Sequence, residues 1–238
     1  MKDEIAVIYP NEAISTAVLK YCRERSLPLP DHIHRHAELT EKQLGDKSEM
    51  MVSRLQAQYL LWTARSFGAK KILEVGCFTG FSALTFAEAL KGVEGAKIVT
   101  MDINPETGAI ARQAFKTAGV DGFVELVLGP ADQTLTDLVP QGPFDLVFLD
   151  ANKEGYITYF NKILELGLVR KGGILIADNV LKKGLVVDAT ENNPSFSDSY
   201  ATSKVPYLKD FNDLVASDKR VETFILPVFD GLALVRVL

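Results

Sequence analysis

Two acids and an amide follow two apolar runs in the second half of the chain. Asp150 comes directly after the run 144–149, and Asp178 and Asn179 come directly after the run 172–177. If both runs are neighbouring parallel strands, their carboxyl ends lie at one edge of a sheet, where ligands bind in open α/β folds. Two carboxylates and an amide oxygen would suit Mg²⁺, Mn²⁺ or Ca²⁺ rather than zinc. The same residue types also form turns and helix caps, so the spacing alone favours neither interpretation.

Lys153 stands three residues after Asp150, at the expected start of a helix. Its amine could remove the proton of a phenol, whose ordinary pKa of about 10 would be lowered by a nearby metal ion. The ammonium would have to lose its own proton first, and a neighbouring dication would favour that loss. From the sequence alone, an ordinary surface lysine is the better-supported interpretation.

A glycine-containing turn lies between a short apolar run and a helix earlier in the chain. The run is 72–75, and Gly76 and Gly80 follow in a Gly-x-x-x-Gly spacing. Glycines at these positions would let the backbone approach a ligand closely. Dinucleotide-binding sites have Gly-x-Gly-x-x-Gly instead, and Glu74 beside the turn would repel a pyrophosphate but attract a cationic amino acid. The turn therefore favours S-adenosylmethionine over NAD.

A third acid, Asp102, ends the run 97–101 and stands 26 residues after Gly76. This interval is close to the one expected for an acid that binds ribose hydroxyls. The alternative is a capping role for the helix that begins at Pro105. The ribose role is favoured, because an acid at a strand end beside the glycine turn can accept hydrogen bonds from two hydroxyls.

The elements that must position these residues alternate between strand and helix. This alternation predicts an α/β fold: a Rossmann-like, doubly wound, mostly parallel seven-stranded sheet with helices on both faces. The last two strands are joined by a short link and are expected to form an antiparallel hairpin. Strands are expected over 72–75, 97–101, 123–128, 144–149, 172–177, 221–226 and 232–237, and the main helices of this domain over 53–67, 81–90, 105–119, 154–166 and 204–217. Residues 182–203 are polar and are expected to form a long loop of the kind that often serves as a lid.

The first fifty residues have helical patterns without strands. Asn11 is expected to cap a helix that runs to about Arg25, and Asp31 to cap a second one. The histidines at 32, 34 and 36 match no zinc pattern, and we expect solvated side chains rather than metal ligands. We therefore divide the chain into residues 1–50, a helical extension that covers the substrate site or forms a dimer surface, and 51–238, the catalytic domain.

Bulk composition limits the classes of partner. The 238-residue chain has a net charge of −5 and a pI near 5.3, which argues against a nucleic-acid-binding surface. No apolar run approaches the roughly 20 residues needed to span a bilayer. The first five residues lack the layout of a secretory signal, and the two cysteines, Cys22 and Cys77, are expected to be free thiols. We therefore expect a cytoplasmic protein.

Taken together, these residues resemble the cation-dependent class I O-methyltransferases of the caffeoyl-CoA type, which are related to catechol O-methyltransferase. The likeness extends from residue 50 to residue 238. Each of its pieces is common alone, and their order is specific. The pieces are Met50-Met51-Val52, Glu74–Ser82, Met101–Asn104, Gly129-Pro130-Ala131, Leu149–Tyr156, Asp178-Asn179 and Leu226–Gly231.

The resemblance implies two groups of site residues. Asp150, Asp178 and Asn179 would hold the divalent cation, and Lys153 would be the catalytic base beside Asp150. Asn152 occupies a position near the cofactor's methionine end that is Asp in the plant enzymes. The other residues implied for the S-adenosylmethionine pocket are Val52, Glu74, Gly76, Cys77, Ser82, Asp102 and Ala131.

Two further departures from the family concern the substrate. Lys182 and Lys183 replace a Trp-Asn pair that often contacts substrate, and the loop 184–203 is longer than usual. The expected substrate is a small phenolic with a vicinal diol, such as caffeate, its CoA ester or another catechol. One hydroxyl would ionise, and the phenolate would attack the sulfonium methyl in line.

Other functions remain as alternatives at this point. An NAD-dependent oxidoreductase would use a similar turn and ribose acid, but the second glycine of its fingerprint is missing. Methylation of nucleic acid would require a basic face, and a non-catalytic module would not need the intact set of acids. The expected partners are thus a small phenolic substrate and a second copy of the chain, without nucleic acid or membrane.

Overall fold

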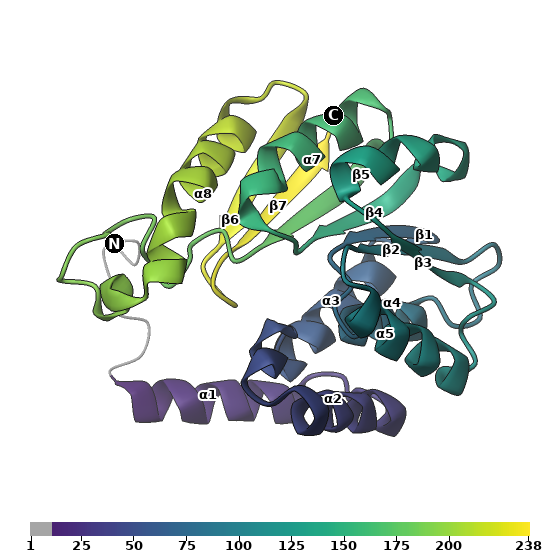
Figure 1. Cartoon of the computed structure of the whole chain (residues 1–238), viewed down its shortest axis with the longest axis horizontal. Helices are drawn as coiled ribbons and strands as arrows, with labels where there is room; N and C mark the ends of the chain where they lie inside the picture. The colour runs from purple at the N-terminus through teal and green to yellow at the C-terminus, as the bar shows by residue number, and fades with distance from the viewer. Residues whose placement is uncertain (1–10) are drawn as a thin grey trace.

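The computed structural model describes residues 11–238. Within this range seven strands form one sheet in the order β3-β2-β1-β4-β5-β7-β6 (Figure 1). Strands β1 to β5 run parallel, and β7 runs antiparallel to both β5 and β6. This confirms the predicted mostly parallel sheet with a C-terminal hairpin. The strands are β1 Lys71–Val75, β2 Lys97–Asp102, β3 Val124–Leu128, β4 Phe144–Leu149, β5 Val169–Asp178, β6 Val221–Leu226 and β7 Leu232–Val237.

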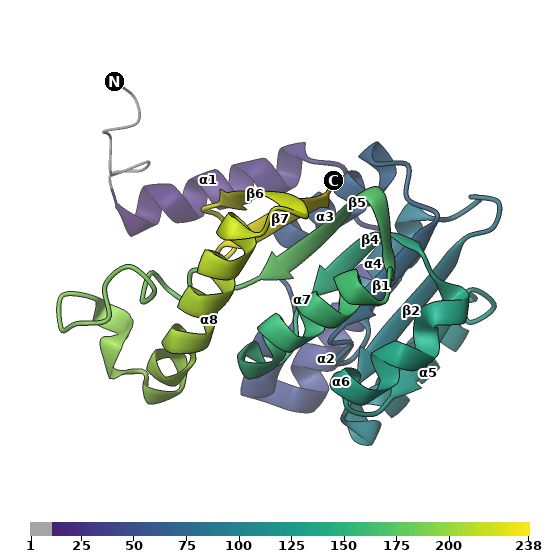
Figure 2. The same ribbon diagram turned by 90° about the horizontal axis from the view of Figure 1, so that it is seen from above.

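Helices cover both faces of the sheet, as predicted (Figure 2). The central strands are apolar on both sides, because each face is buried under a helical layer. Leu61, Phe86 and Ile72 belong to one buried cluster, whereas Phe160 and Phe211 belong to the other. The first layer contains α3 Arg54–Ser66, α4 Phe81–Ala89 and α5 Pro105–Ala118, and the second contains α7 Tyr156–Glu165 and α8 Ser199–Ser217.

The strand order reverses between β1 and β4. From β1 the chain builds outward to β2 and β3, and it then returns to the other side of β1 to place β4 and β5. The end of β4 is joined to the end of β1, since the N–H of Asp150 donates to the carbonyl of Val75 at 2.9 Å. Ligands of open α/β sheets bind at such a reversal, outside the carboxyl ends of the strands. The fold therefore places the glycine turn and Asp150 at one point.

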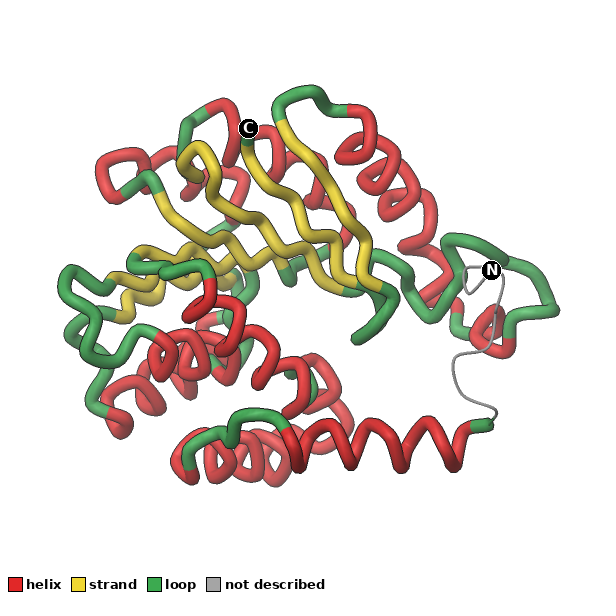
Figure 3. The backbone as a smooth tube through the Cα atoms, turned by 180° about the vertical axis from the view of Figure 1, so that it is seen from behind, coloured by secondary structure: helices red, strands yellow, loops and turns green. Residues whose placement is uncertain are grey.

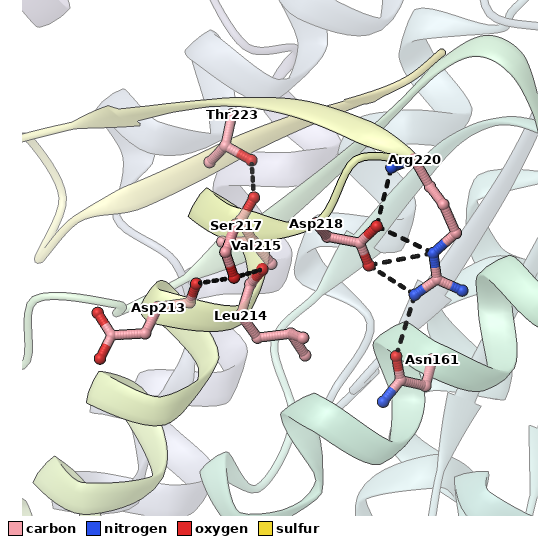
Figure 4. A network of polar contacts seen from close by, with 8 residues as sticks. All are labelled: Asn161, Asp213, Leu214, Val215, Ser217, Asp218, Arg220 and Thr223. Atoms are coloured by element: carbon pink, nitrogen blue, oxygen red, sulfur yellow. Dashed lines mark hydrogen bonds and ion pairs between the residues drawn. The ribbon is translucent and has the colours of Figure 1, made fainter.

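A polar network fixes the C-terminal hairpin to the second helical layer (Figure 4). Asp218, directly after α8, accepts hydrogen bonds from the backbone N–H and the guanidinium of Arg220. Arg220 also donates to Asn161 of α7 at 3.3 Å. On β6, the hydroxyl of Thr223 donates to the carbonyl of Val215 at 2.8 Å. The hairpin thus has a fixed position beside β5.

Two helices precede this domain core, α1 Glu12–Arg25 and α2 Asp31–Leu44. Asn11 caps α1 as predicted, because its side-chain oxygen accepts from the N–H of Ile14 at 3.0 Å. The predicted cap at Asp31 is wrong. Pro30 occupies the N-cap position without a side-chain hydrogen bond, and Asp31 is already the first helical residue, where its charge complements the helix dipole.

The prediction of three solvated histidines is wrong for His36. Its side chain is buried, whereas His32 and His34 are partly exposed. The ring nitrogen Nε2 of His36 donates to the carbonyl of Thr79 at 2.8 Å. The cause is helical periodicity, which places position 36 on the face of α2 that packs against α4. The other buried residues of that face are Ile33, Ala37 and Thr40.

The segment before α8 is shorter than the predicted loop. The helix begins at Ser199 rather than near residue 204, because Asp198 caps it: its side chain accepts from the N–H of Ala201 at 2.9 Å. Pro206 lies inside the helix. A short 3-10 turn, η5 Pro194–Ser197, precedes the cap. Strand β5 also begins earlier than predicted, because Val169 pairs with Phe144 before the strand register shifts.

No helix in the described range is long and apolar enough to cross a membrane. The expectation about the first five residues lies outside the described part of the chain. The division of the chain at residue 50 stays a prediction, although Ile33 and Ala37 of α2 belong to the same buried cluster as Leu61 of α3.

Candidate functional site

The glycines of the turn after β1 allow close packing of protein against protein. A Cβ on Gly76, whose φ is +106°, would lie 1.9 Å from the carbonyl oxygen of Asp150. A Cβ on Gly80 would lie 2.8 Å from the ring of Phe115 on α5. Gly76 is therefore required by the backbone at the end of β4, and Gly80 is required by the packing of α5. Close approach of a ligand remains a separate prediction.

Glu74 is fully buried at the end of β1. One carboxylate oxygen accepts a hydrogen bond from the hydroxyl of Thr100 on β2, and the other, Oε1, has no partner. Burial raises the pKa of Glu74 to about 8, although the Thr100 and Ser82 hydroxyls oppose the shift. A buried acceptor without a partner is costly, so this site favours a ligand with a donor. The ammonium of the methionine part of S-adenosylmethionine fits this requirement.

Asp102 ends β2 and shapes the same turn. Its Oδ2 accepts from the N–H groups of Cys77 at 3.0 Å and Phe78 at 2.6 Å, and its Oδ1 accepts from the N–H of Asn104 at 2.9 Å. The alternative role of Asp102 as a helix cap is wrong, because Asn104 caps α5 through the N–H of Glu106. Asp102 thus fixes the backbone beside Gly76, and its half-buried carboxylate remains at the strand end.

The other residues predicted for the cofactor pocket come from four places. Val52 lines a cavity of about 230 Å³ between α2 and the start of α3, together with Phe81. Ser82 is buried in the first turn of α4. Ala131 begins the short helix α6 Ala131–Thr134 after β3 and is half-buried. The amide oxygen of Asn152 accepts from the hydroxyl of Tyr159 at 2.8 Å.

The predicted metal and catalytic residues meet at the ends of β4 and β5. Lys153 is buried, and its Nζ donates to Asp150 Oδ1 at 3.1 Å and approaches the carbonyl of Asp178 at 3.4 Å. Burial alone would lower the pKa of Lys153, but Tyr156, Asp150 and Asp178 together raise it above its ordinary value. Asn179 adopts a left-handed backbone with φ of +56°. The structure therefore brings the side chains of Lys153 and Asp150 into direct contact, joins Lys153 to the backbone of Asp178, and places Asn179 directly after Asp178.

Two residues of this group were not predicted as site residues. The hydroxyl of Tyr156 accepts from Lys153 Nζ at 2.5 Å, and its single hydrogen lies between two acceptors, the carbonyls of Asp178 at 2.9 Å and Leu149 at 3.1 Å. Gln56 on α3 is buried, and its amide donates to Asp178 Oδ2 at 2.7 Å. Tyr156 stands at helical spacing from Lys153, which could have indicated the contact. Gln56 is 122 residues from its partner, and no sequence pattern indicates it.

These side chains also fit a divalent cation by their chemistry. Burial, followed by repulsion from Asp150, raises the pKa of Asp178 well above its ordinary value, so a nearby positive charge would stabilise its ionised form. The available donors are carboxylate and amide oxygens, which hard cations prefer. Residues 11–238 contain no cluster of three His, Cys, Asp or Glu side chains that could hold a metal. A cation here would therefore need the Asn179 amide beside the two carboxylates.

Comparisons with known proteins also indicate a methyltransferase. A family model described as O-methyltransferase matches residues 23–238. The chain is 35% identical over 237 residues to the O-methyltransferase ankF of Aspergillus thermomutatus, with 98% of each protein covered. It is 34% identical to caffeoyl-CoA O-methyltransferase 2 of Populus trichocarpa, with 93% of this chain and 89% of that protein covered.

Solved structures extend this likeness to three dimensions. The methyltransferase PaMTH1 of Podospora anserina, solved with bound S-adenosylhomocysteine (SAH), superposes with a TM-score of 0.91 at 36% identity. The superposition covers 98% of this chain and 99% of that one. The O-methyltransferase of Bacillus cereus in complex with SAH gives 0.79 at 28% identity, over 94% and 100%. The fold and the strand-end site thus define a Rossmann-like, S-adenosylmethionine-dependent methyltransferase.

The chain belongs to the O-methyltransferase family, and it is an S-adenosylmethionine-dependent O-methyltransferase. The alternative of an NAD-dependent oxidoreductase is not supported. The family and the predicted cofactor were both indicated by the ordered motifs of the sequence. The individual site residues remain predictions, to which the geometry above gives physical roles.

Proposed function

We propose that this O-methyltransferase acts on one hydroxyl of a catechol-like vicinal diol and that it depends on a divalent cation. The observation that carries the proposal is the convergence of Asp150, Lys153 and Asp178 at the strand ends, directly beside the turn at Gly76. Relatives named as caffeoyl-CoA O-methyltransferases support a phenolic substrate of this class. Mg²⁺, Mn²⁺ or Ca²⁺ on Asp150, Asp178 and Asn179 would supply acidity to the bound phenol.

The side chains of the chain itself have distinct roles in this proposal. Gln56 holds the carboxylate of Asp178 in one orientation through a 2.7 Å hydrogen bond. Tyr156 holds the ammonium of Lys153 beside Asp150. Glu74 offers an unpartnered acceptor to the cofactor's ammonium, and Asp102 lies where ribose hydroxyls are expected. Fixing the phenol oxygen and the sulfonium methyl in line would account for much of the rate.

The protonation state of Lys153 decides how it acts. With a raised pKa it is an ammonium at neutral pH, so it stabilises a phenolate by charge in this arrangement. To act as the base, it must first transfer its proton away, and additional positive charge beside Asp150 would favour that loss. The products would be a methyl ether and S-adenosylhomocysteine.

Isosteric substitutions of the two acids test the proposal. For Asp150→Asn and Asp178→Asn, we expect methyl transfer to a catechol to fall by about 100-fold or more, while the Kd for S-adenosylhomocysteine changes little. The measurements are methyl transfer with and without EDTA, and isothermal titration. Asp213→Asn, on the exposed side of α8, is the matched control. Metal-independent turnover by wild type, or full turnover by both variants, would exclude the metal role.

The remaining parts of the proposal concern the setting of the enzyme. Its partners are a small phenolic substrate and a second copy of the chain, with no role for nucleic acid or membrane, and its compartment is the cytoplasm. Support for a homodimer comes from α1, in which no residue is buried. Residues 1–50 would then form the dimer surface or cover the site, and residues 51–238 would form the catalytic domain.

A further inference from the structure

The segment that follows the metal-ligand candidates is held in an unusual backbone conformation. Lys182 and Lys183 both have left-handed φ angles, +45° and +54°. The hairpin loop fixes them, because the N–H of Leu181 donates to the carbonyl of Asp230 and the N–H of Lys183 donates to its carboxylate. A Cβ on Gly231 would lie 2.4 Å from Leu181, so the two segments are in tight contact. Left-handed backbone at two successive non-glycine residues is costly and often marks a functional segment.

Three lysines of this region differ in their ionic partners. Lys183 Nζ pairs with Asp198 at 2.9 Å, and Lys204 Nζ pairs with Glu154 at 2.5 Å. In the described part of the chain, no carboxylate lies within 4.0 Å of the ammonium of Lys182. Lys182 is nevertheless half-buried, whereas Lys183 is exposed. Partial burial of a cation that has no ion-pair partner costs free energy.

The position of Lys182 links it to the site. It stands three residues after Asn179, and its ammonium is close enough to Lys153 for the two charges to repel. Burial, followed by this repulsion, lowers the pKa of Lys182, although the carboxylates of Asp230 and Asp198 oppose the shift. Its Nζ lies 5.6 Å from the centre of the Tyr200 ring, which is largely exposed to solvent. The ring offers a flat apolar surface beside the cation, and an anion here would remove the electrostatic cost.

We propose that Lys182 is a specificity-determining residue that forms an ion pair with the carboxylate of a phenolic acid whose diol occupies the Asp150–Asp178 edge. A carboxylate on an unsaturated or aromatic arm would meet both the ammonium and the flat ring of Tyr200. The paired lysines, Lys183 and Lys204, are already neutralised by their acids. This inference rests on the catechol substrate proposed above and adds the charge of its substituent.

The test compares three forms of one catechol: caffeic acid, its methyl ester and its CoA thioester. For Lys182→Met, we expect the ratio of kcat/KM for the acid to that for the ester to fall about 10-fold, because one charge-assisted pair is lost. The Kd of caffeic acid for the complex with S-adenosylhomocysteine and Mg²⁺, measured by isothermal titration, should rise by a similar factor. Lys183→Met, which removes the neighbouring but acid-paired ammonium, is the control and should keep the ratio.

Each other outcome overturns the inference in a distinguishable way. An unchanged ratio in Lys182→Met, or an equal fall in Lys183→Met, means that Lys182 is a solvated loop residue. A loss confined to the CoA thioester means that phosphates, not a carboxylate, contact Lys182. If wild type methylates none of the three compounds, the proposed function fails together with the inference. If wild type methylates the acid and the ester but the ratio of kcat/KM is unchanged in Lys182→Met, the proposed function stands and the inference about Lys182 fails.

Discussion

At the scale of single residues, Glu74 is the side chain whose burial gives the sharpest prediction about cofactor binding. It is an acid with no exposed surface, one satisfied oxygen and one oxygen without a partner. The protonated form is favoured in the protein alone, because burial raises its pKa to about 8. A bound ammonium would reverse that preference, since it stabilises the carboxylate. Cofactor binding and proton release at Glu74 should therefore be linked.

This linkage predicts a pH dependence of stability. The pKa of Glu74 rises from 4.5 to about 8 on folding, so the folded protein holds the proton more tightly than the unfolded chain. The contribution of Glu74 to the free energy of unfolding is then fully present below about pH 4.5 and is lost as the pH rises toward 8. For Glu74→Gln without cofactor, we expect the melting temperature to fall less than that of wild type between pH 5 and 8.

The comparison of the two melting curves isolates Glu74 from Asp178, which titrates in the same direction and is present in both proteins. The Kd of Glu74→Gln for S-adenosylhomocysteine should rise about 10-fold, measured at pH 8 by isothermal titration. Parallel pH profiles for the two proteins would mean that Glu74 is ionised without cofactor.

The residue types at strand ends could be predicted from sequence, because an acid directly after an apolar run is a local pattern. Asp102, Asp150 and Asp178 all lie where the runs placed them. The partners of those acids could not be predicted in the same way. Gln56 reaches Asp178 across 122 positions, and only the packing of α3 under β5 brings them together.

At the scale of elements, α2 supports the glycine turn between β1 and α4. His36 donates to the carbonyl of Thr79, and the hydroxyl of Thr40 donates to that of Thr79 at 3.0 Å. Thr79 itself is fully buried, between Phe78, whose φ is +51°, and Gly80. The turn is thus held from outside the sheet by a helix that precedes it by about 40 residues, and α2 contributes to the geometry of the site.

Thr40 allows a conservative test of this support. In Thr40→Val the side-chain volume is kept and the hydroxyl is lost, so the buried Thr79 hydroxyl loses a partner. We expect the Kd for S-adenosylhomocysteine to rise about five-fold, while Thr40→Ser, which keeps the donor, restores wild-type affinity. Isothermal titration measures both. Equal affinities for Thr40→Val and wild type would show that the turn holds its shape without α2.

Most elements followed from local sequence, and the exceptions have identifiable causes. The five parallel strands are short apolar runs between glycines and polar residues, and buried strands of this kind are readily recognised. The start of α8 was placed too late because residues 182–203 are polar and were expected to form a loop, whereas Asp198 caps the helix at Ser199. The burial of His36 depends on which face of α2 packs against α4, and this is set by tertiary packing rather than by local sequence.

At the scale of the whole molecule, α1 stands out from an otherwise packed structure. It runs beside the first helical layer and extends beyond it (Figure 3). None of its residues is buried, and Ile14, Leu19 and Tyr21 expose apolar surface to solvent, as does Trp62 on α3. A 14-residue helix with so little tertiary packing is marginal in water by itself. A second copy of the chain would supply the missing contacts.

The dimer prediction can be checked by mass. Wild type should elute at twice the 26.2 kDa of the chain in size-exclusion chromatography with light scattering. Leu19→Glu combined with Tyr21→Glu should shift it to the monomer, because charges would replace apolar contacts. Val139→Glu, at an exposed apolar position of the turn η3 Leu135–Gln141, is the matched control. A monomeric wild type would exclude this role for α1.

The contact between Gly76 and Asp150 has a consequence for how such an enzyme can diversify. The predicted donor side at Gly76 and the predicted acceptor side at Asp150 meet through backbone atoms, where even one added methyl group would lie 1.9 Å from a carbonyl oxygen. The separation of the two half-sites is therefore set by main-chain sterics, which side-chain mutations elsewhere leave unaltered. The segment from Val180 to Asp198 is anchored at its start, where Val180 is buried and its N–H donates to the carbonyl of Gly231, whereas most of residues 187–198 are exposed. We therefore expect exchanges within residues 187–198 to alter the choice of acceptor while the contact between Gly76 and Asp150 stays the same.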